Sequence, residues 1–226
     1  MANYFDEELK SLKNEVLTMA TMVEDSISKS LEALKKRDLK IAAEIKQIDK
    51  RIDKMEIAIE ERCIELIARH QPVGSDLRFL IGAIKMNNDL ERMGDHAVNI
   101  ADCVQFLIDQ PRIKPISNIW TMAKIVNEML KESVDSFIAN DAVRAQKVCE
   151  RDSTVDEMRN EIIRITLTYM LEEPEKIGSA IQYFLVAKNL ERIADLSTNI
   201  CEDTIYISQA RIIKHHIEEE KKNKPV

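Results

Sequence analysis

One polar motif occurs twice in this chain, a hundred residues apart. "DLERMGDHAVNI" occupies residues 89–100 and "NLERIADLSTNI" occupies residues 189–200. Upstream of the motif the two halves also match at an offset of 103, where Asp38 aligns with Asp141 and Val23 with Val126. A repeat of this length constrains the architecture strongly, because both halves must build the same supersecondary unit.

Each half contains three segments with the pattern of an amphipathic helix. Apolar residues recur at spacings of three and four, beginning with the stripe from Leu9 to Leu34. Ser75, after "QPVG", is the expected N-cap of the third helix. Short loops make consecutive helices antiparallel, so the expected fold class is all-α, with two tandem three-helix bundles. The predicted helices cover residues 6–36, 39–70, 75–109, 117–140, 142–171 and 176–210.

The repeat also sets the expected domain boundaries. We predict a first three-helix bundle over residues 1–112, a second over residues 113–212 and a polar tail over residues 213–226. Only 4 Gly and 5 Pro occur in 226 residues, which favours long uninterrupted helices.

Composition excludes several classes of protein. The formal net charge is −7 and no basic stripe occurs, so we expect no nucleic-acid partner. No stretch of about 18 apolar residues is present, so we expect no membrane insertion. The acidic start, "MANYFDEELK", lacks the apolar run of a signal peptide. The four cysteines are widely spaced, which is typical of reduced thiols in a cytoplasmic protein.

Two acid pairs of the first half are expected to face each other. Asp49 and Asp53 are four residues apart, as are Glu91 and Asp95, so each pair lies on one face of a helix. Asp53 lies 19 residues before Pro72 and Glu91 lies 19 residues after it. In an antiparallel hairpin turning at this proline the two pairs are level. The sequence therefore predicts a patch of four carboxylates.

The second half repeats this arrangement around Pro174. We predict a second patch of four carboxylates, made by Asp152, Asp156, Glu191 and Asp195. Possible additional ligands continue the same stripes one or two turns further on; they are Asn99, Asn199, Asp102 and Glu202.

Four neighbouring carboxylates repel one another, and a multivalent cation that prefers oxygen would compensate them. We therefore expect iron, manganese, magnesium or calcium to bind there. A different interpretation stays open at this point, in which the acids lie on solvated faces or pair with nearby cations. The available cations are Lys50, Arg51, Arg92 and Arg192.

Signals for other chemistry are weak. The four histidines do not form the Glu-x-x-His motif of a di-iron bundle. His96 has no counterpart in the second half, where Leu196 stands, and we expect it to be a surface residue. The chain has no phosphate-binding glycine loop and no nucleophile elbow, so no catalytic residue is assigned.

The sequence resembles the PhoU family of phosphate-uptake regulators over residues 5–210. The segments "QPVGSDLR", "DLERMGDHAVNIA" and "NLERIADLSTNICED" carry the resemblance, together with the twofold repeat of three helices. The resemblance implies a cytoplasmic, non-enzymatic accessory protein, often dimeric, that represses the phosphate-starvation response. It implies the ATPase subunit of the phosphate ABC transporter and the phosphate-sensing histidine kinase as partners. It also implies that the doubled acid motifs bind metal, including iron clusters.

The two halves differ at positions that bear on this expectation. Arg159 stands in the second half where Glu56 stands in the first, so the two sites are expected to differ in charge and occupancy. Gly94 of the first motif is Ala194 in the second, which keeps a small residue at the helix contact.

Three hypotheses for the function follow. The leading one is a non-enzymatic regulator that links phosphate transport to phosphate signalling. The second is an iron- or manganese-dependent phosphate-binding enzyme, or a metal store, which uses the carboxylate patches. The third is a structural scaffold whose acids are solvated.

Overall fold

The computed structural model describes residues 2–113 and 116–209, and the predicted polar tail lies outside them. Every regular element in these residues is helical, which confirms the all-α fold class. The elements are α1 (Ala2–Lys36), α2 (Leu39–His70), α3 (Gly74–Leu107), α4 (Ser117–Ala139), α5 (Ala142–Cys149), α6 (Asp152–Glu172), the 3-10 turn η1 (Pro174–Lys176) and α7 (Ile177–Gln209).

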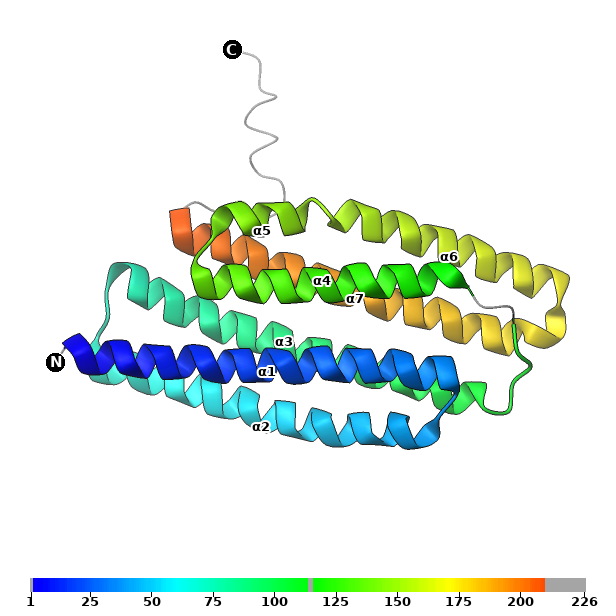
Figure 1. Cartoon of the computed structure of the whole chain (residues 1–226), viewed down its shortest axis with the longest axis horizontal. Helices are drawn as coiled ribbons and strands as arrows, with labels where there is room; N and C mark the ends of the chain where they lie inside the picture. The colour runs from blue at the N-terminus through cyan, green and yellow to red at the C-terminus, as the bar shows by residue number, and fades with distance from the viewer. Residues whose placement is uncertain (1, 114–115, 210–226) are drawn as a thin grey trace, which may run out of the picture.

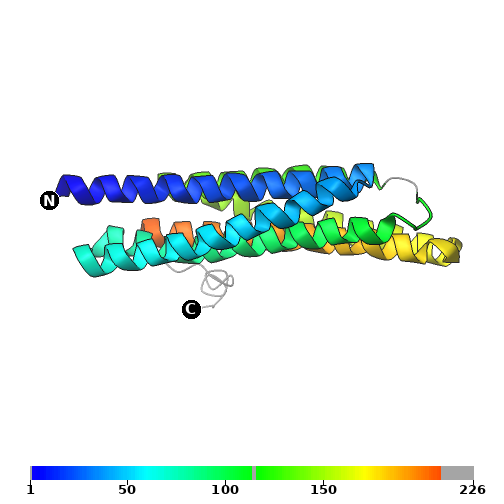
Figure 2. The ribbon, with the colours of Figure 1, turned by 90° about the horizontal axis from the view of Figure 1, so that it is seen from below.

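The helices form two antiparallel bundles that lie side by side (Figure 1). α1, α2 and α3 build the first bundle, and α4 to α7 build the second. The α2–α3 turn and the α6–α7 turn lie at opposite ends of the elongated molecule, as Figures 1 and 2 show. In the residues from 2 to 113 and from 116 to 209, no helix combines the length and apolar character needed to cross a bilayer.

Two aspartates fix where the second helix of each repeat begins. The Asp38 carboxylate accepts hydrogen bonds from the backbone N–H groups two and three residues ahead, at 2.8 and 3.4 Å. Asp141 does the same, with both bonds at 3.0 Å. The preceding residues, Arg37 and Asn140, are left-handed, with φ of 54° and 53°. The aligned aspartates therefore serve one function, which is to cap a helix.

Two sequence predictions about helix ends were wrong. α3 begins at Gly74, its N-cap residue is Val73, and the hydroxyl of Ser75 bonds to Asp76 rather than capping the helix. The predicted helix over residues 142–171 is interrupted at Arg151, where an N–H bond to the carbonyl three residues back replaces the usual bond to the fourth. The Arg151 guanidinium holds this break by binding both carboxylate oxygens of Glu132 on α4, at 3.0 and 3.1 Å.

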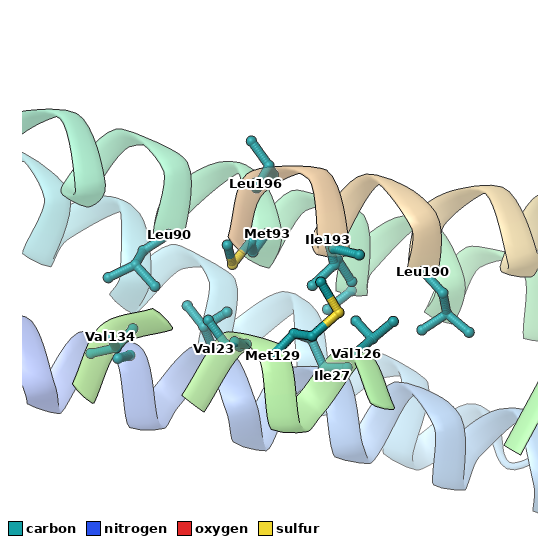
Figure 3. Close-up of a cluster of buried hydrophobic side chains, with 14 of the residues drawn as sticks. Val23, Ile27, Leu90, Met93, Val126, Met129, Val134, Leu190, Ile193 and Leu196 are labelled. Atoms are coloured by element: carbon teal, nitrogen blue, oxygen red, sulfur yellow. The ribbon is translucent and has the colours of Figure 1, made fainter. Parts of the chain in front are cut away.

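One hydrophobic core runs through both bundles. Figure 3 shows α1, α3, α4 and α7 meeting around residues from both repeats. Repeat-related residues such as Leu90 and Leu190 are both fully buried there. Gly82 marks a close approach of α3 to α7, because a Cβ at this position would lie 2.2 Å from Cδ1 of Ile207. The repeats are therefore packed as one body through α3 and α7.

Candidate carboxylate sites

The structure brings the first set of predicted acids together across the α2–α3 hairpin. Burial, followed by the charges of Asp53 and Asp95, raises the pKa of Asp49 to about 6. Burial also raises the pKa of Glu91, followed by the charges of Asp95 and Asp53. We call Asp49, Asp53, Glu91 and Asp95 the first cluster. Asp49 and Glu91 therefore respond to the charges of neighbouring acids on both helices, as their level positions in the hairpin predicted.

Within the described residues, none of the four carboxylates of the first cluster forms an ion pair. Arg92, one of the cations that could have done so, binds Asp89 instead at 3.4 Å. Gly94 of α3 faces α2 here, because a Cβ at this position would lie 3.3 Å from Cδ1 of Ile52 and 3.4 Å from a carboxylate oxygen of Asp49. The first cluster thus concentrates uncompensated negative charge.

The second cluster, Asp152, Asp156, Glu191 and Asp195, forms across the α6–α7 hairpin. Burial, followed by the charges of Asp195 and Asp156, raises the pKa of Asp152 to about 6. Burial also raises the pKa of Asp195, while the charge and hydrogen bond of Arg192 oppose the increase. Burial therefore acts on two acids of each cluster, and the second cluster also has a cation beside it.

Two arginines pair with the second cluster and distinguish it from the first. The Arg159 guanidinium donates a hydrogen bond to Glu191 at 2.8 Å and lies 3.6 Å from Asp156. Arg192 donates to Asp195 at 2.9 Å. In the first half Glu56 replaces Arg159, and its charge instead adds to the increase in the pKa of Glu91. The sequence left open whether the acids pair with nearby cations. In the structure they do so in the second cluster and not in the first.

The four possible additional ligands lie in different surroundings. Asp102 forms an ion pair with Lys46 at 2.7 Å, and Glu202 is close enough to raise the pKa of Asp152. Asn99 is exposed. Asn199 lines a separate pocket of about 470 Å³ at the junction of α2, α3 and α7. Of these residues, Glu202 is the one whose charge acts on an acid of a cluster.

The chemistry available to the first cluster follows from its donor atoms. All four side chains offer carboxylate oxygens, which hard cations such as Mg²⁺, Mn²⁺ and iron prefer. Within residues 2–113 and 116–209, however, no three His, Cys, Asp or Glu side chains converge closely enough to form a ready metal site. Ligand type and number suit a cation, and binding would require the side chains to draw together.

The sequence analysis did not place Glu56 next to the first cluster, and it misplaced one histidine. Glu56 lies seven residues after Asp49, a helical spacing that could have placed it on the same face. His96 was expected at the surface, but it is half-buried between α3 and α7, and its Nδ1 lies 2.9 Å from Oδ1 of Asn189. His70 likewise contacts Glu8 at 2.7 Å, so both described histidines hold helices together.

Both repeats of the chain are similar to proteins of a known family. The PhoU domain matches residues 16–104 and 119–204, one match for each repeat. A phosphate-specific transport system accessory protein PhoU homolog of Aquifex aeolicus is 45% identical over 214 residues, covering 94% of this chain and 97% of that protein.

Two solved structures share the fold. The crystal structure of PhoU from Pseudomonas aeruginosa superposes with a TM-score of 0.86 at 33% identity, covering 92% of this chain and 100% of that one. The phosphate transport system regulatory protein PhoU from Streptococcus pneumoniae gives a TM-score of 0.87 at 31% identity, covering 93% of this chain and 99% of that one. Similarity of sequence and of fold thus extends over nearly the full length of each protein.

Proposed function

The chain belongs to the PhoU family, and we propose on that basis that it is an accessory regulator of phosphate uptake. The observation that carries this proposal is the 45% identity to a phosphate-specific transport system accessory protein over 94% of the chain. Since the match extends through both repeats, it covers the whole architecture and not one shared motif. The proposed role is non-enzymatic, because it requires binding and release of partners rather than turnover of a substrate.

The partners follow from the family. We propose that the chain works in the cytoplasm, as a homodimer, with the ATPase subunit of the phosphate ABC transporter and with the phosphate-sensing histidine kinase. In high phosphate it restrains uptake and keeps the kinase from activating the starvation response.

We further propose that the first cluster binds a divalent or trivalent cation, with iron, manganese and magnesium as the candidates. Asp49, Asp53, Glu91 and Asp95 would hold it. When bound, the cation supplies positive charge that relieves the repulsion among these carboxylates. The side chains themselves then tie α2 to α3, since two ligands come from each helix.

The second cluster would bind the same cations more weakly. Glu191 already accepts a hydrogen bond from Arg159, and Asp195 accepts one from Arg192. These guanidinium groups repel an incoming cation, which must displace them in order to bind. At the first cluster a cation meets no such competitor. The proposed order of occupancy is therefore first cluster, then second.

Gene deletion tests the proposed regulatory role. In a strain of the source organism that lacks this gene, phosphate-starvation genes should be expressed even in high phosphate, and a plasmid copy should restore repression. Normal repression in the deletion strain would contradict the proposal. Affinity purification from cells grown in high and in low phosphate should recover the transporter ATPase and the kinase; recovery of neither in either condition would contradict the proposed partners.

A further inference from the structure

One exposed apolar pair occurs at equivalent positions of both repeats. In the first bundle it is Ile64 of α2, 55% exposed, and Ile81 of α3, 44% exposed. In the second bundle the aligned residues are Leu167 of α6 and Ile181 of α7, which are 50% and 40% exposed. Ile64 lies eight residues before Pro72 and Ile81 nine residues after it, so the two are level in the α2–α3 hairpin. An apolar pair that both halves expose to solvent does not serve the core, and it points to a surface that another molecule covers.

The pocket of about 470 Å³ described above adjoins the pair of the first bundle. Glu56 and Glu60 of α2 and Ile84 of α3 line this pocket. Ile64 follows Glu60 by four residues, and Ile81 precedes Ile84 by three, so both lie on the face of their helix that borders the pocket. We call the surface made by Glu56, Glu60, Ile64, Ile81 and Ile84 the first hairpin face.

The first hairpin face carries acids that lack a cation. Among the described residues, Glu56, Glu60 and the neighbouring Glu61 form no ion pair. Lys85 also lines the pocket, but it binds Asp203 at 3.2 Å. The face therefore combines exposed apolar side chains with uncompensated negative charge, and a partner that complements it carries apolar and basic residues together.

The hairpin of the second bundle differs in charge. Ile163 and Arg164 stand at the positions aligned with Glu60 and Glu61. The pair of Leu167 and Ile181 thus lies beside an apolar and a basic residue, where the first pair lies beside two acids. Of the two hairpins, the first is the one suited to a basic partner.

A second copy of the chain does not suit the first hairpin face. A twofold dimer formed through this surface would place the same face of each protomer against the other. The glutamates would then meet equal charges, which weakens such a contact.

We propose that the first hairpin face binds an amphipathic helix of a partner protein, whose apolar stripe is bordered by Lys or Arg. The stripe covers Ile64 and Ile81, since apolar residues at spacings of three and four fit a groove between two helices. One basic side chain of the partner enters the pocket and donates hydrogen bonds to Glu56 and Glu60, while its aliphatic stem packs on Ile84. The inference rests on the proposed function, a regulator that works by binding other proteins, and it names the chemistry of such a partner.

Fluorescence anisotropy with a synthetic peptide tests the proposal on the full-length, chelator-treated protein. The probe is a labelled helical peptide of about 18 residues, with leucines at spacings of three and four and lysines beside them. It should bind with saturation, and more weakly as salt is added. Ile64→Ser with Ile81→Ser should lower the affinity about tenfold or more, because the covered apolar area is lost. Glu56→Gln with Glu60→Gln should lower it several-fold and reduce its dependence on salt.

The repeat supplies the matched control. Leu167→Ser with Ile181→Ser removes the aligned pair of the second bundle and should leave the affinity unchanged. Circular dichroism of each variant should match that of the wild type. The proposal is wrong if the peptide does not bind, if a peptide with glutamate in place of lysine binds equally well, or if both double serine variants lose affinity alike.

Light scattering separates a partner protein from a second copy. If Ile64→Ser with Ile81→Ser converts a dimer of this protein into monomers, the face is a contact between copies and the proposal is wrong. The peptide assay uses purified protein alone, so its failure is distinguishable from failure of the regulatory role. Loss of repression in the deletion strain, combined with no peptide binding, would overturn this inference and leave the proposed function standing.

Discussion

Replacing Asp49 by Asn should stabilise the metal-free protein at neutral pH. Burial, Asp53 and Asp95 raise the pKa of Asp49 from 3.8 to about 6, so the folded protein holds this charge less readily than the unfolded chain does. The full increase in the pKa of Asp49 corresponds to a loss of roughly 3 kcal/mol in the free energy of unfolding. Asp49 is half-exposed and solvent screens its charge, so we expect about 1–1.5 kcal/mol. For a chain of this length, that gain raises Tm by roughly 3–5 °C.

The stabilisation by Asp49→Asn should depend on pH, in a direction that follows from the raised pKa. Because the folded pKa lies above the unfolded one, the wild-type folded state takes up a proton first as the pH falls. The penalty of the charged Asp49 is fully present above a pH of about 6 and is lost as the pH falls toward 4. The difference in unfolding free energy between variant and wild type should therefore be largest at pH 7 and should shrink toward pH 4.

Urea unfolding of chelator-treated protein, followed by circular dichroism from pH 4 to pH 7, measures this difference. Asp135→Asn is the matched control, because Asp135 forms an ion pair with Arg144 at 2.8 Å and its loss should not stabilise the protein. An Asp49→Asn variant that is no more stable than wild type at pH 7 would contradict the proposed penalty of the charged Asp49. So would a gain that stays constant down to pH 4.

Three further substitutions test packing, capping and the paired cluster. Arg159→Ala leaves Glu191, only 7% exposed, without its 2.8 Å donor, and should lower the unfolding free energy by about 1–2 kcal/mol in urea. Gly82→Ala forces a methyl group against Ile207 and should lower the unfolding free energy by about 1–3 kcal/mol, which thermal unfolding would show. Asp38→Ala removes the N-cap of α2 and should lower it by about 1 kcal/mol; unchanged unfolding would contradict the capping assignment.

Much of the fold could be predicted from the sequence because the repeat and the helical periodicity agree. The predicted starts of α2 and α5, at residues 39 and 142, are confirmed, and the structure adds that the aligned carboxylates of Asp38 and Asp141 cap these helices. The break between α5 and α6 could not be predicted. Apolar residues continue across it with helical spacing, and it is held by the long-range pair of Arg151 with Glu132 on α4.

The candidate sites were predictable to the extent that they depend on hairpin register. Counting from Pro72 placed the acids of α2 level with those of α3, and their charges do interact in the structure. The partner of Glu191 was harder to foresee, because the nearby Arg192 pairs chiefly with Asp195 while Arg159 crosses from α6. Side-chain direction on neighbouring helices decides such pairings, and spacing within one helix does not.

Metal titration of chelator-treated protein tests whether the first cluster binds a cation ahead of the second. Manganese at a concentration of 100 times its dissociation constant should stabilise the wild type by about 2.7 kcal/mol, or roughly 5–10 °C in Tm. Asp53→Ala with Glu91→Ala should abolish most of this increase, whereas Asp156→Ala with Glu191→Ala should preserve it. A full increase in the first double variant, or its loss only in the second, would contradict the account.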